Sequence, residues 1–234
     1  MIKAVLFDLD NTLVDFFKMK NEAVDAAVTA MVDAGLKLSQ EEAHNEIYSI
    51  YKDEGIEFQE VFDRFLKKVI GEIDHKILAA GIVAYRRARE AALVLYPHVN
   101  MTLMKLMKKG YKLAVISDAP RRQAWLRLCY LNLHHIFDKV ITFEDTGVRK
   151  PDPAPFRLAM ELLDVKPEET MMIGDWLERD MAGASSLGIR TVYAKYGDSY
   201  PRYDGKPKDN SAEADFVAED ISDILDILEK LNDV

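Results

Sequence analysis

The sequence lacks the features on which several classes of protein depend. It has one cysteine, Cys129, so it forms no internal disulfide and no CxxC redox or zinc site, and a reducing cytoplasm is the compartment that fits best. The stretch around it, "WLRLCYLNL", has a largely apolar helical pattern, which predicts a packed, structural thiol rather than a nucleophile. The longest apolar stretches, such as "ILAAGIVAY", fall short of the roughly 20 residues that cross a bilayer. We therefore expect neither export nor a membrane anchor.

The chain also has fewer basic than acidic residues. The chain has 31 Lys and Arg against 40 Asp and Glu, for a formal net charge of −9. Because affinity for nucleic-acid backbones comes from clustered Lys and Arg, this balance argues against a general nucleic-acid binder. With 234 residues, of which 49% are hydrophobic, the chain suffices for one large α/β domain or for one domain that carries a smaller insertion. No pattern in it specifies an oligomeric state.

The beginning and the last 140 or so residues carry short apolar runs that are typical of strands. These runs cover residues 3–7, 111–117, 139–143, 170–174, 190–194 and 214–218. Helical patterns separate them, at 99–109, 120–131, 154–164, 179–187 and 220–231. Strands that alternate with helices, and that are apolar almost throughout, predict a parallel sheet covered on both faces. The sequence therefore predicts an α/β fold with a Rossmann-like, three-layer core formed by residues 1–15 and 96–234.

Residues 16–95 have a different texture, with four amphipathic helical patterns and no convincing strand. Their apolar residues recur at helical spacing, as in the stripe from Phe58 to Val69. Such a stripe is typical of packing in a helix bundle rather than of a ligand box. Because this block lies between the first and second strands, we expect it to form an inserted all-helical cap domain that can move as a lid.

Polar residues follow the predicted strands at the points where they end. They are Asp8 and Asp10 after the first strand, Ser117 and Asp118 after the second, Lys150 after the third, and Asp175 and Asp180 after the fourth. In an open α/β sheet, ligands bind outside the carboxyl ends of the strands. We therefore expect these side chains to gather at one rim.

The residue types at this rim are suited to a metal and a phosphate. Crowded carboxylates repel one another unless a cation compensates, and oxygen-only ligands suit Mg²⁺. A hydroxyl and a lysine donate hydrogen bonds and charge to an anion such as phosphate. A carboxylate beside a metal-held phosphate can attack phosphorus and form an aspartyl-phosphate. Each residue alone has a structural explanation as a turn, cap or solvated residue, but their order after successive strands favours the joint functional interpretation.

The motifs resemble those of the haloacid dehalogenase superfamily. In order they are "DLDNT", the Ser of "VISDA", the Lys of "RKPDP", and "GDWLERD", with the helical insertion where the family's cap lies. "GVRKPDPAPF" and "DMAGA" look especially similar to its capped phosphatases. The resemblance implies a Mg²⁺-dependent phosphomonoester hydrolase that acts on a small phosphorylated metabolite, with a sugar or triose phosphate as the candidate.

The resemblance also implies roles for single residues. Asp8 would be the nucleophile and a metal ligand, and Asp10 would be the acid/base whose backbone carbonyl binds the metal. Asp175 would be a metal ligand, and Asp180 would hold the metal directly or through water. The substrate-binding residues would be Thr12, Ser117, Asp118 and Lys150.

Three other functions compete with this interpretation. The 2-haloacid dehalogenases of the same superfamily lack a carboxylate at the second position and need no metal, whereas Asp10, Asp175 and Asp180 are present here. A phosphosugar mutase would reuse the phosphoenzyme and would depend on cap residues that we cannot identify from one sequence. A non-catalytic binding protein predicts the loss of at least one catalytic residue, and none is missing.

Substrate choice is expected to depend on the cap. The candidates near its hinges are Phe16, Phe17, Lys18 and Lys20 on entry, and Arg86, Arg87 and Arg89 on exit. A solvated helix face is the other explanation for the arginine cluster. The irregular segment 195–213 is either a simple connection or a functional flap that presents Tyr196, Tyr200 and Tyr203.

Overall fold

A computed structural model describes residues 1–199 and 212–233 of the chain. Within them the chain divides into two compact units. The first contains residues 1–15, 95–199 and 212–233, and the second contains residues 16–94. The two units are described in turn.

The described part of the first unit contains a six-stranded sheet in the order β3-β2-β1-β4-β5-β6, in which all five pairs of neighbouring strands are parallel. The strands are β1 (Ala4–Phe7), β2 (Lys112–Ile116), β3 (Lys139–Ile141), β4 (Thr170–Gly174), β5 (Arg190–Ala194) and β6 (Phe216–Ala218). Each lies within a run that the sequence predicted to be a strand, and the predicted α/β, Rossmann-like core is confirmed. Phe7 of β1 pairs in register with Val115 of β2 and Ile173 of β4, so these strands end together at one edge.

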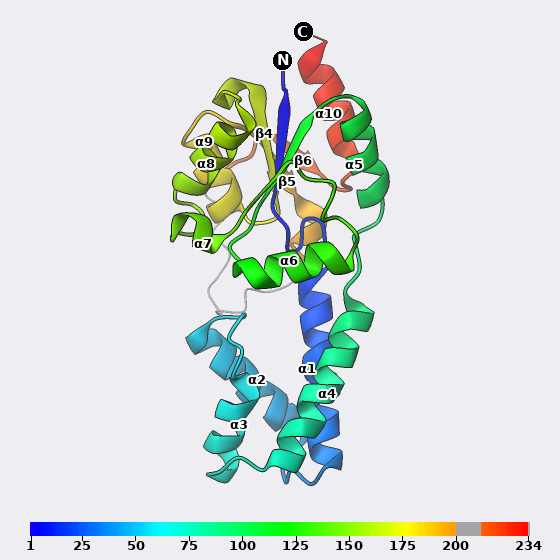
Figure 1. Ribbon diagram of the computed structural model, residues 1–234, viewed down its shortest axis with the longest axis vertical. Coiled ribbons are helices and arrows are strands. Elements are labelled where there is room, and N and C mark those ends of the chain that lie inside the picture. The colour runs from blue at the N-terminus through cyan, green and yellow to red at the C-terminus, as the bar shows by residue number, and fades with distance from the viewer. Residues whose placement is uncertain (200–211, 234) are drawn as a thin grey trace. The chain divides into compact units, whose positions relative to one another are not determined.

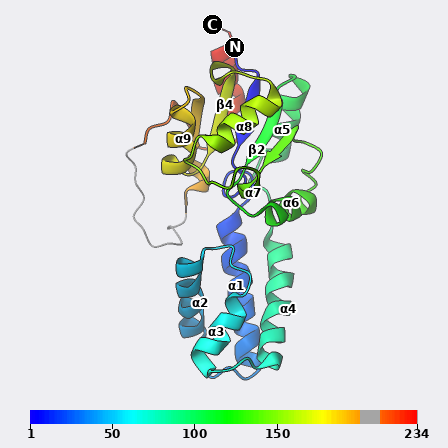
Figure 2. The ribbon, with the colours of Figure 1, turned by 60° about the vertical axis from the view of Figure 1, so that its left-hand side comes forward.

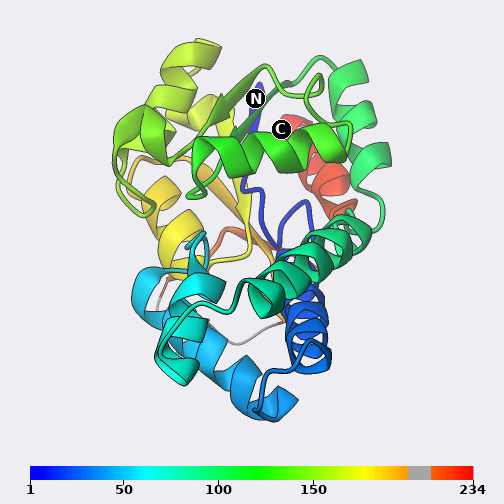
Figure 3. The ribbon, with the colours of Figure 1, turned by 60° about the horizontal axis from the view of Figure 1, so that its bottom comes forward.

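Helices cover both faces of this sheet. On one face lie α8 (Ala154–Leu163) and α9 (Ala182–Ser185), and on the other lie α5 (Val99–Lys108) and α10 (Asp223–Asn232) (Figure 1, Figure 3). Alternate strand residues such as Leu6 and Met172 pack against Phe156 and Leu163 of α8. Burial on both sides explains why the strands are apolar almost throughout.

The shorter elements of this unit connect the strands. They are α6 (Arg121–Tyr130), α7 (Phe143–Thr146), and the short turns η1 (Pro167–Glu169), η2 (Leu177–Met181) and η3 (Lys195–Gly197). The helix predicted over 179–187 is different in the structure, because its start belongs to η2, which is a π-helix, and the α-helix begins only at Ala182. Within η2 the carboxylate of Asp180 accepts a 3.0 Å hydrogen bond from the backbone N–H of Trp176. The wide π turn thus directs Asp180 inward, and such turns are common at functional sites.

The second unit consists of four helices: α1 (Phe16–Asp33), α2 (Gln40–Glu54), α3 (Val61–Ile70) and α4 (His75–Ala92). Helices α1 and α4 lie side by side (Figure 1, Figure 2). The aromatic stripe of α3 is in the core of this unit, where Phe65 and Leu66 are fully buried. The stripe has a structural role, because its side chains pack against apolar residues of the other three helices.

One local prediction is wrong. Cys129 is exposed rather than packed. Helix α6 buries Ala124, Arg127 and Leu128, and Cys129 lies one position beyond that buried face. In the described part of the chain, no helix combines the length and the apolar character that crossing a membrane requires.

Candidate active site

A tight turn after β1 holds the first two acidic residues. The backbone N–H of Asp8 still continues the sheet, because it donates a 2.9 Å hydrogen bond to Ile173 O of β4. The chain then reverses: Asn11 has a φ of 60°, and its N–H donates to Val14 O at 2.7 Å. A positive φ is tolerated by Asn better than by most residues. The turn therefore keeps both Asp8 and Asp10 at the carboxyl edge of the sheet.

Lys150 lies among the carboxylates of this edge. Its Nζ is 2.6 Å from Oδ1 of Asp8 and 2.6 Å from Oδ1 of Asp180, and it also donates a 3.1 Å hydrogen bond to Ile116 O at the end of β2. Burial by itself lowers the pKa of Lys150, but the carboxylates of Asp180, Asp8 and Asp118 outweigh it and raise that pKa above its ordinary value. The lysine is therefore a permanent cation in this site.

Asp8 is buried, with 8% of its surface exposed. Removal from water raises the pKa of its carboxyl to about 7, and the like charges of Asp180 and Asp10 act in the same direction, whereas Lys150 acts against them. A carboxylate that is costly to ionise and lies beside a fixed cation is typical of a functional site rather than of a surface turn.

Three buried carboxylates converge here. Oxygen atoms of Asp8, Asp175 and Asp180 all lie within 4.8 Å of one another. Such a compact group of oxygen donors fits a hard divalent cation, which prefers carboxylate, carbonyl and water ligands. The residues present are thus able to hold a metal ion.

The other predicted site residues lie on adjacent loops. Ser117 is buried after β2, and its Oγ accepts a 3.2 Å hydrogen bond from the N–H of Ala119. Asp118 accepts a 2.9 Å hydrogen bond from the N–H of Lys150 and pairs with Arg179 at 3.3 Å. The Asp118 carboxylate thus holds the lysine loop in place. Thr12 is fully buried, and its hydroxyl has no hydrogen-bond partner among the residues that the structure describes.

Two contacts of this site are missing from the sequence prediction. Arg127 of α6, which is 6% exposed, donates a 3.0 Å hydrogen bond from Nη1 to Oδ2 of Asp10. The spacing in the sequence could have predicted this contact. Arg127 lies three residues after Ala124, and residues with this spacing lie on the same face of a helix, which here is the buried one. The hydroxyl of Tyr196 donates a 2.8 Å hydrogen bond to Thr12 O. Tyr200 and Tyr203, the other members of the predicted flap, lie outside the described residues.

The hinge candidates of the second unit have different environments. Phe16, Phe17 and Lys20 are buried, while Lys18, Arg86 and Arg87 are exposed. Lys20 Nζ donates a 3.1 Å hydrogen bond to the hydroxyl of Tyr85 and lies 4.2 Å from the ring centroid of Tyr51. A role of these residues in substrate choice stays a prediction.

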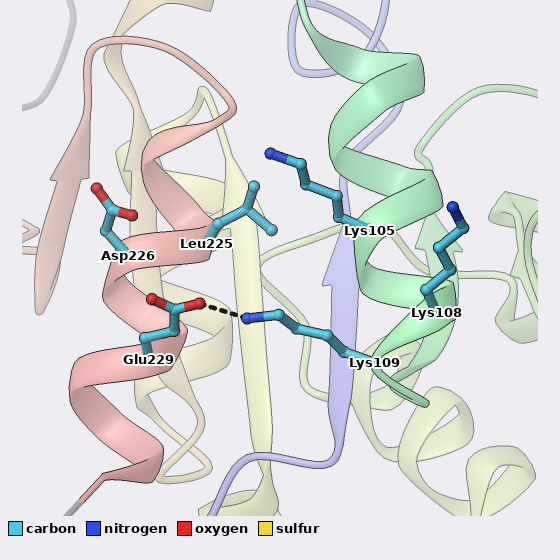
Figure 4. Close-up of a pocket in the computed structure, with 6 residues that line it drawn as sticks. All are labelled: Lys105, Lys108, Lys109, Leu225, Asp226 and Glu229. Carbon is cyan, nitrogen blue, oxygen red and sulfur yellow. Dashed lines mark hydrogen bonds and ion pairs between the residues drawn. The ribbon is translucent and has the colours of Figure 1, made fainter.

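A groove of about 400 Å³ lies away from the acidic cluster, between α5 and α10. Its lining residues are Lys105, Lys108, Lys109, Leu225, Asp226 and Glu229 (Figure 4). Lys109 and Glu229 form an ion pair across it. Because α5 ends here, just before β2 starts, the groove belongs to the amino edge of the sheet and not to the edge that bears Asp8.

Comparison with known proteins gives one consistent family. The sequence profile of the haloacid dehalogenase-like hydrolases matches residues 2–188. A glyceraldehyde 3-phosphate phosphatase from Methanopyrus kandleri is 37% identical, with 99% of each chain covered. The pyrophosphatase PpaX from Bacillus mycoides is 30% identical, with 99% of each chain covered. A crystal structure of a putative beta-phosphoglucomutase from Thermotoga maritima has the same fold, with a TM-score of 0.73 at 24% identity over 98% of this chain and 99% of that one.

Proposed function

This chain belongs to the haloacid dehalogenase-like hydrolases, and we propose that it is a phosphatase that hydrolyses the phosphate ester of a triose, with glyceraldehyde 3-phosphate as the substrate. The observation that carries the chemistry is the buried set formed by Asp8, Lys150 and Asp180, with Asp175 beside it. The substrate rests on the relatives named glyceraldehyde 3-phosphate phosphatase, which match this chain over nearly its whole length. The carboxylates and the lysine of this site converge on one position. Such a site suits a small substrate that carries a single phosphate group.

The reaction has two steps in this proposal. In the first, a carboxylate oxygen of Asp8 attacks phosphorus, the bond from phosphorus to the ester oxygen breaks, and that oxygen takes a proton from Asp10. In the second, water attacks phosphorus and gives a proton to Asp10, and the bond to Asp8 breaks to release inorganic phosphate. Asp8 and Asp10 then have their original protonation states, so the cycle is balanced.

The remaining residues bind and orient the phosphoryl group. Lys150 and Ser117 donate to its oxygens, and Thr12 supports the loop that carries Asp8. Asp118 acts through its hold on the backbone of Lys150. Because phosphoryl transfer depends mainly on in-line positioning and on cationic stabilisation, these contacts supply much of what the reaction needs.

The metal of this proposal is Mg²⁺. Asp8, Asp175, Asp180 and the backbone carbonyl of Asp10 would hold it. When bound, Mg²⁺ offsets the negative charge of the carboxylates and the phosphate.

The proposal can be tested with a panel of substrates. Purified protein with Mg²⁺ is mixed with glyceraldehyde 3-phosphate, glucose 1-phosphate, inorganic pyrophosphate, p-nitrophenyl phosphate and 2-chloropropionate, and the release of phosphate or chloride and the formation of glucose 6-phosphate are measured. The triose phosphate should give the highest kcat/KM. A higher value for pyrophosphate would contradict the proposed substrate, and chloride release or conversion of glucose 1-phosphate to its 6-phosphate isomer would contradict the proposed reaction.

The nucleophile needs a separate test. Asp8→Asn should abolish turnover, because an amide does not attack phosphorus, and rapidly quenched wild-type protein should carry one phosphoryl group by mass spectrometry. Near-normal turnover in this variant would exclude a covalent intermediate on Asp8.

A further inference from the structure

Arg127 is an unusual residue for the buried face of a helix. It is 6% exposed, whereas its neighbours on the same face are Ala124 and Leu128. Arginine is rarely buried to this extent unless its charge is paired. Its partner is the carboxylate of Asp10, to which Nη1 donates a 3.0 Å hydrogen bond. Burying the guanidinium of Arg127 costs free energy, because the charge is removed from water. The packing of α6 alone does not explain why an arginine stands at this position.

The partner is the one carboxylate that the proposed reaction uses for proton transfer. Asp10 and Arg127 are 117 residues apart in sequence, and they meet because β1 and β2 are neighbours and α6 follows the loop after β2. The Asp10 side chain keeps 21% of its surface exposed, against 7% for that of Arg127. The arginine is thus the more buried member of the pair.

We propose that Arg127 is a positioning residue for the acid/base Asp10, an inference that rests on the proposed function. The guanidinium is planar and has a fixed arrangement of donors, so a charge-assisted bond to Oδ2 fixes the rotation of the carboxyl group. In this proposal the carboxyl group, held in one orientation, transfers the proton to the oxygen of the leaving group. Without the bond from Arg127 the orientation of the carboxyl group would be less tightly fixed, and the proton would be delivered in a smaller fraction of encounters.

This role predicts a dependence on the leaving group. The alkoxide released from a triose phosphate needs a proton as it departs, whereas p-nitrophenolate leaves without one. Arg127→Gln should therefore lower kcat/KM for glyceraldehyde 3-phosphate by about 100-fold, the cost of a misplaced catalytic group. It should leave kcat/KM for p-nitrophenyl phosphate nearly unchanged. We compare kcat/KM rather than kcat, because kcat/KM reports only the steps up to the release of the first product, in which Asp10 acts as the acid.

Three further variants make the test decisive. Arg127→Lys should recover part of the loss, because a lysine can donate one bond but lacks the planar group. Arg122→Gln removes the same charge from an exposed position of α6 and should change neither substrate. Asp10→Asn should show the same dependence on the leaving group as Arg127→Gln, in a stronger form. Thermal unfolding of each variant checks that it is folded, and Arg127→Lys replaces Arg127→Gln if the latter is not.

The outcomes separate the inference from the function on which it rests. If Asp10→Asn discriminates between the two substrates and the Arg127 variants lower both equally, or neither, the positioning role is wrong and the acid role of Asp10 stands. If Asp10→Asn itself does not discriminate between the two substrates, Asp10 is not the acid. The positioning role of Arg127 is then wrong as well.

Discussion

The amine of Lys150 donates a 2.6 Å hydrogen bond to Oδ1 of Asp8, between two side chains that are 3% and 11% exposed. The same amine is 2.6 Å from Asp180. One lysine therefore serves as the counter-charge of two buried carboxylates. The strand ends bring these residues together, but their proximity has a cost that the cation must offset.

Replacement of Lys150 by methionine should destabilise the metal-free protein strongly. The carboxylates of Asp8 and Asp180 would be left buried without a cation, and the loss of one partner from a buried pair typically costs about 3–5 kcal/mol. Urea unfolding without Mg²⁺ measures this change, and added Mg²⁺ should recover part of it. Lys3→Met is the matched control, because Lys3 pairs with Glu169 at the surface and exposed pairs contribute little. Equal stability of the two variants would show that the buried cation is not needed.

Stabilisation by Mg²⁺ should depend on pH. Burial raises the pKa of Asp8 from 3.8 to about 7. Between these two values the folded protein keeps a proton that the unfolded chain has lost, so the free energy of unfolding falls as pH rises from about 4 to about 7. A cation that binds the ionised form recovers this loss. The increase in Tm on adding saturating Mg²⁺ should be small near pH 5.5 and should level off above about pH 8. Asp8→Asn should give a flatter profile, and an increase in Tm that is independent of pH in the wild-type protein would contradict the assignment.

Gly197 should not tolerate even an alanine. A Cβ atom at this position would lie 1.6 Å from the backbone oxygen of Asn11 and 3.1 Å from Cβ of Asp175. The turn that carries Asp8 and Asp10 would have to shift, and a shift of about 1 Å at a reacting group costs on the order of 100-fold in rate. Gly197→Ala should thus lower kcat for p-nitrophenyl phosphate sharply.

The control for this variant is Gly81→Ala in α4. The three heavy atoms nearest to a Cβ atom there all belong to the flexible side chain of Met31, so kcat should be unchanged. If Gly197→Ala kept full activity, close packing of η3 against the turn would not be a requirement of the site.

Lys20 offers a test of the helical unit. It is 4% exposed, and among the residues that the structure describes no carboxylate forms an ion pair with it. Its contacts are the hydroxyl of Tyr85 and the ring of Tyr51. Burying an ammonium group without a countercharge is costly, and methionine fills a similar volume without a charge, so Lys20→Met should increase the free energy of unfolding by about 1 kcal/mol.

We expect the same variant to lose selectivity, because Lys20 is the buried cation among the residues predicted to set substrate choice at the start of the helical unit. The measurement is the ratio of kcat/KM for glyceraldehyde 3-phosphate to that for p-nitrophenyl phosphate. Lys18→Met is the control, since Lys18 is exposed in the same helix. A stabilised variant with unchanged selectivity would exclude Lys20 from substrate choice.

The order of the elements could be predicted from the sequence because it depends on local patterns. Runs that are apolar almost throughout, such as residues 170–174, indicate strands buried on both faces, and each such run contains a strand. The residues after these strands could be named as well, since parallel strands end at one edge whatever the details of their packing. The environment of Cys129 was predicted wrongly because an apolar stretch does not say which side of a helix faces the sheet.

By itself, the sequence determined the fold class, the helical insertion and the acidic and basic residues of the rim, because each follows from periodicity or from position after a strand. Only the tertiary structure decided which of them touch. The contacts of Lys150 with Asp8 and Asp180, of Asp118 with the Lys150 backbone, and of Arg127 with Asp10 depend on distances between segments that are far apart in the chain. Those distances are set by how side chains pack between the sheet and its helices, and no local pattern contains them.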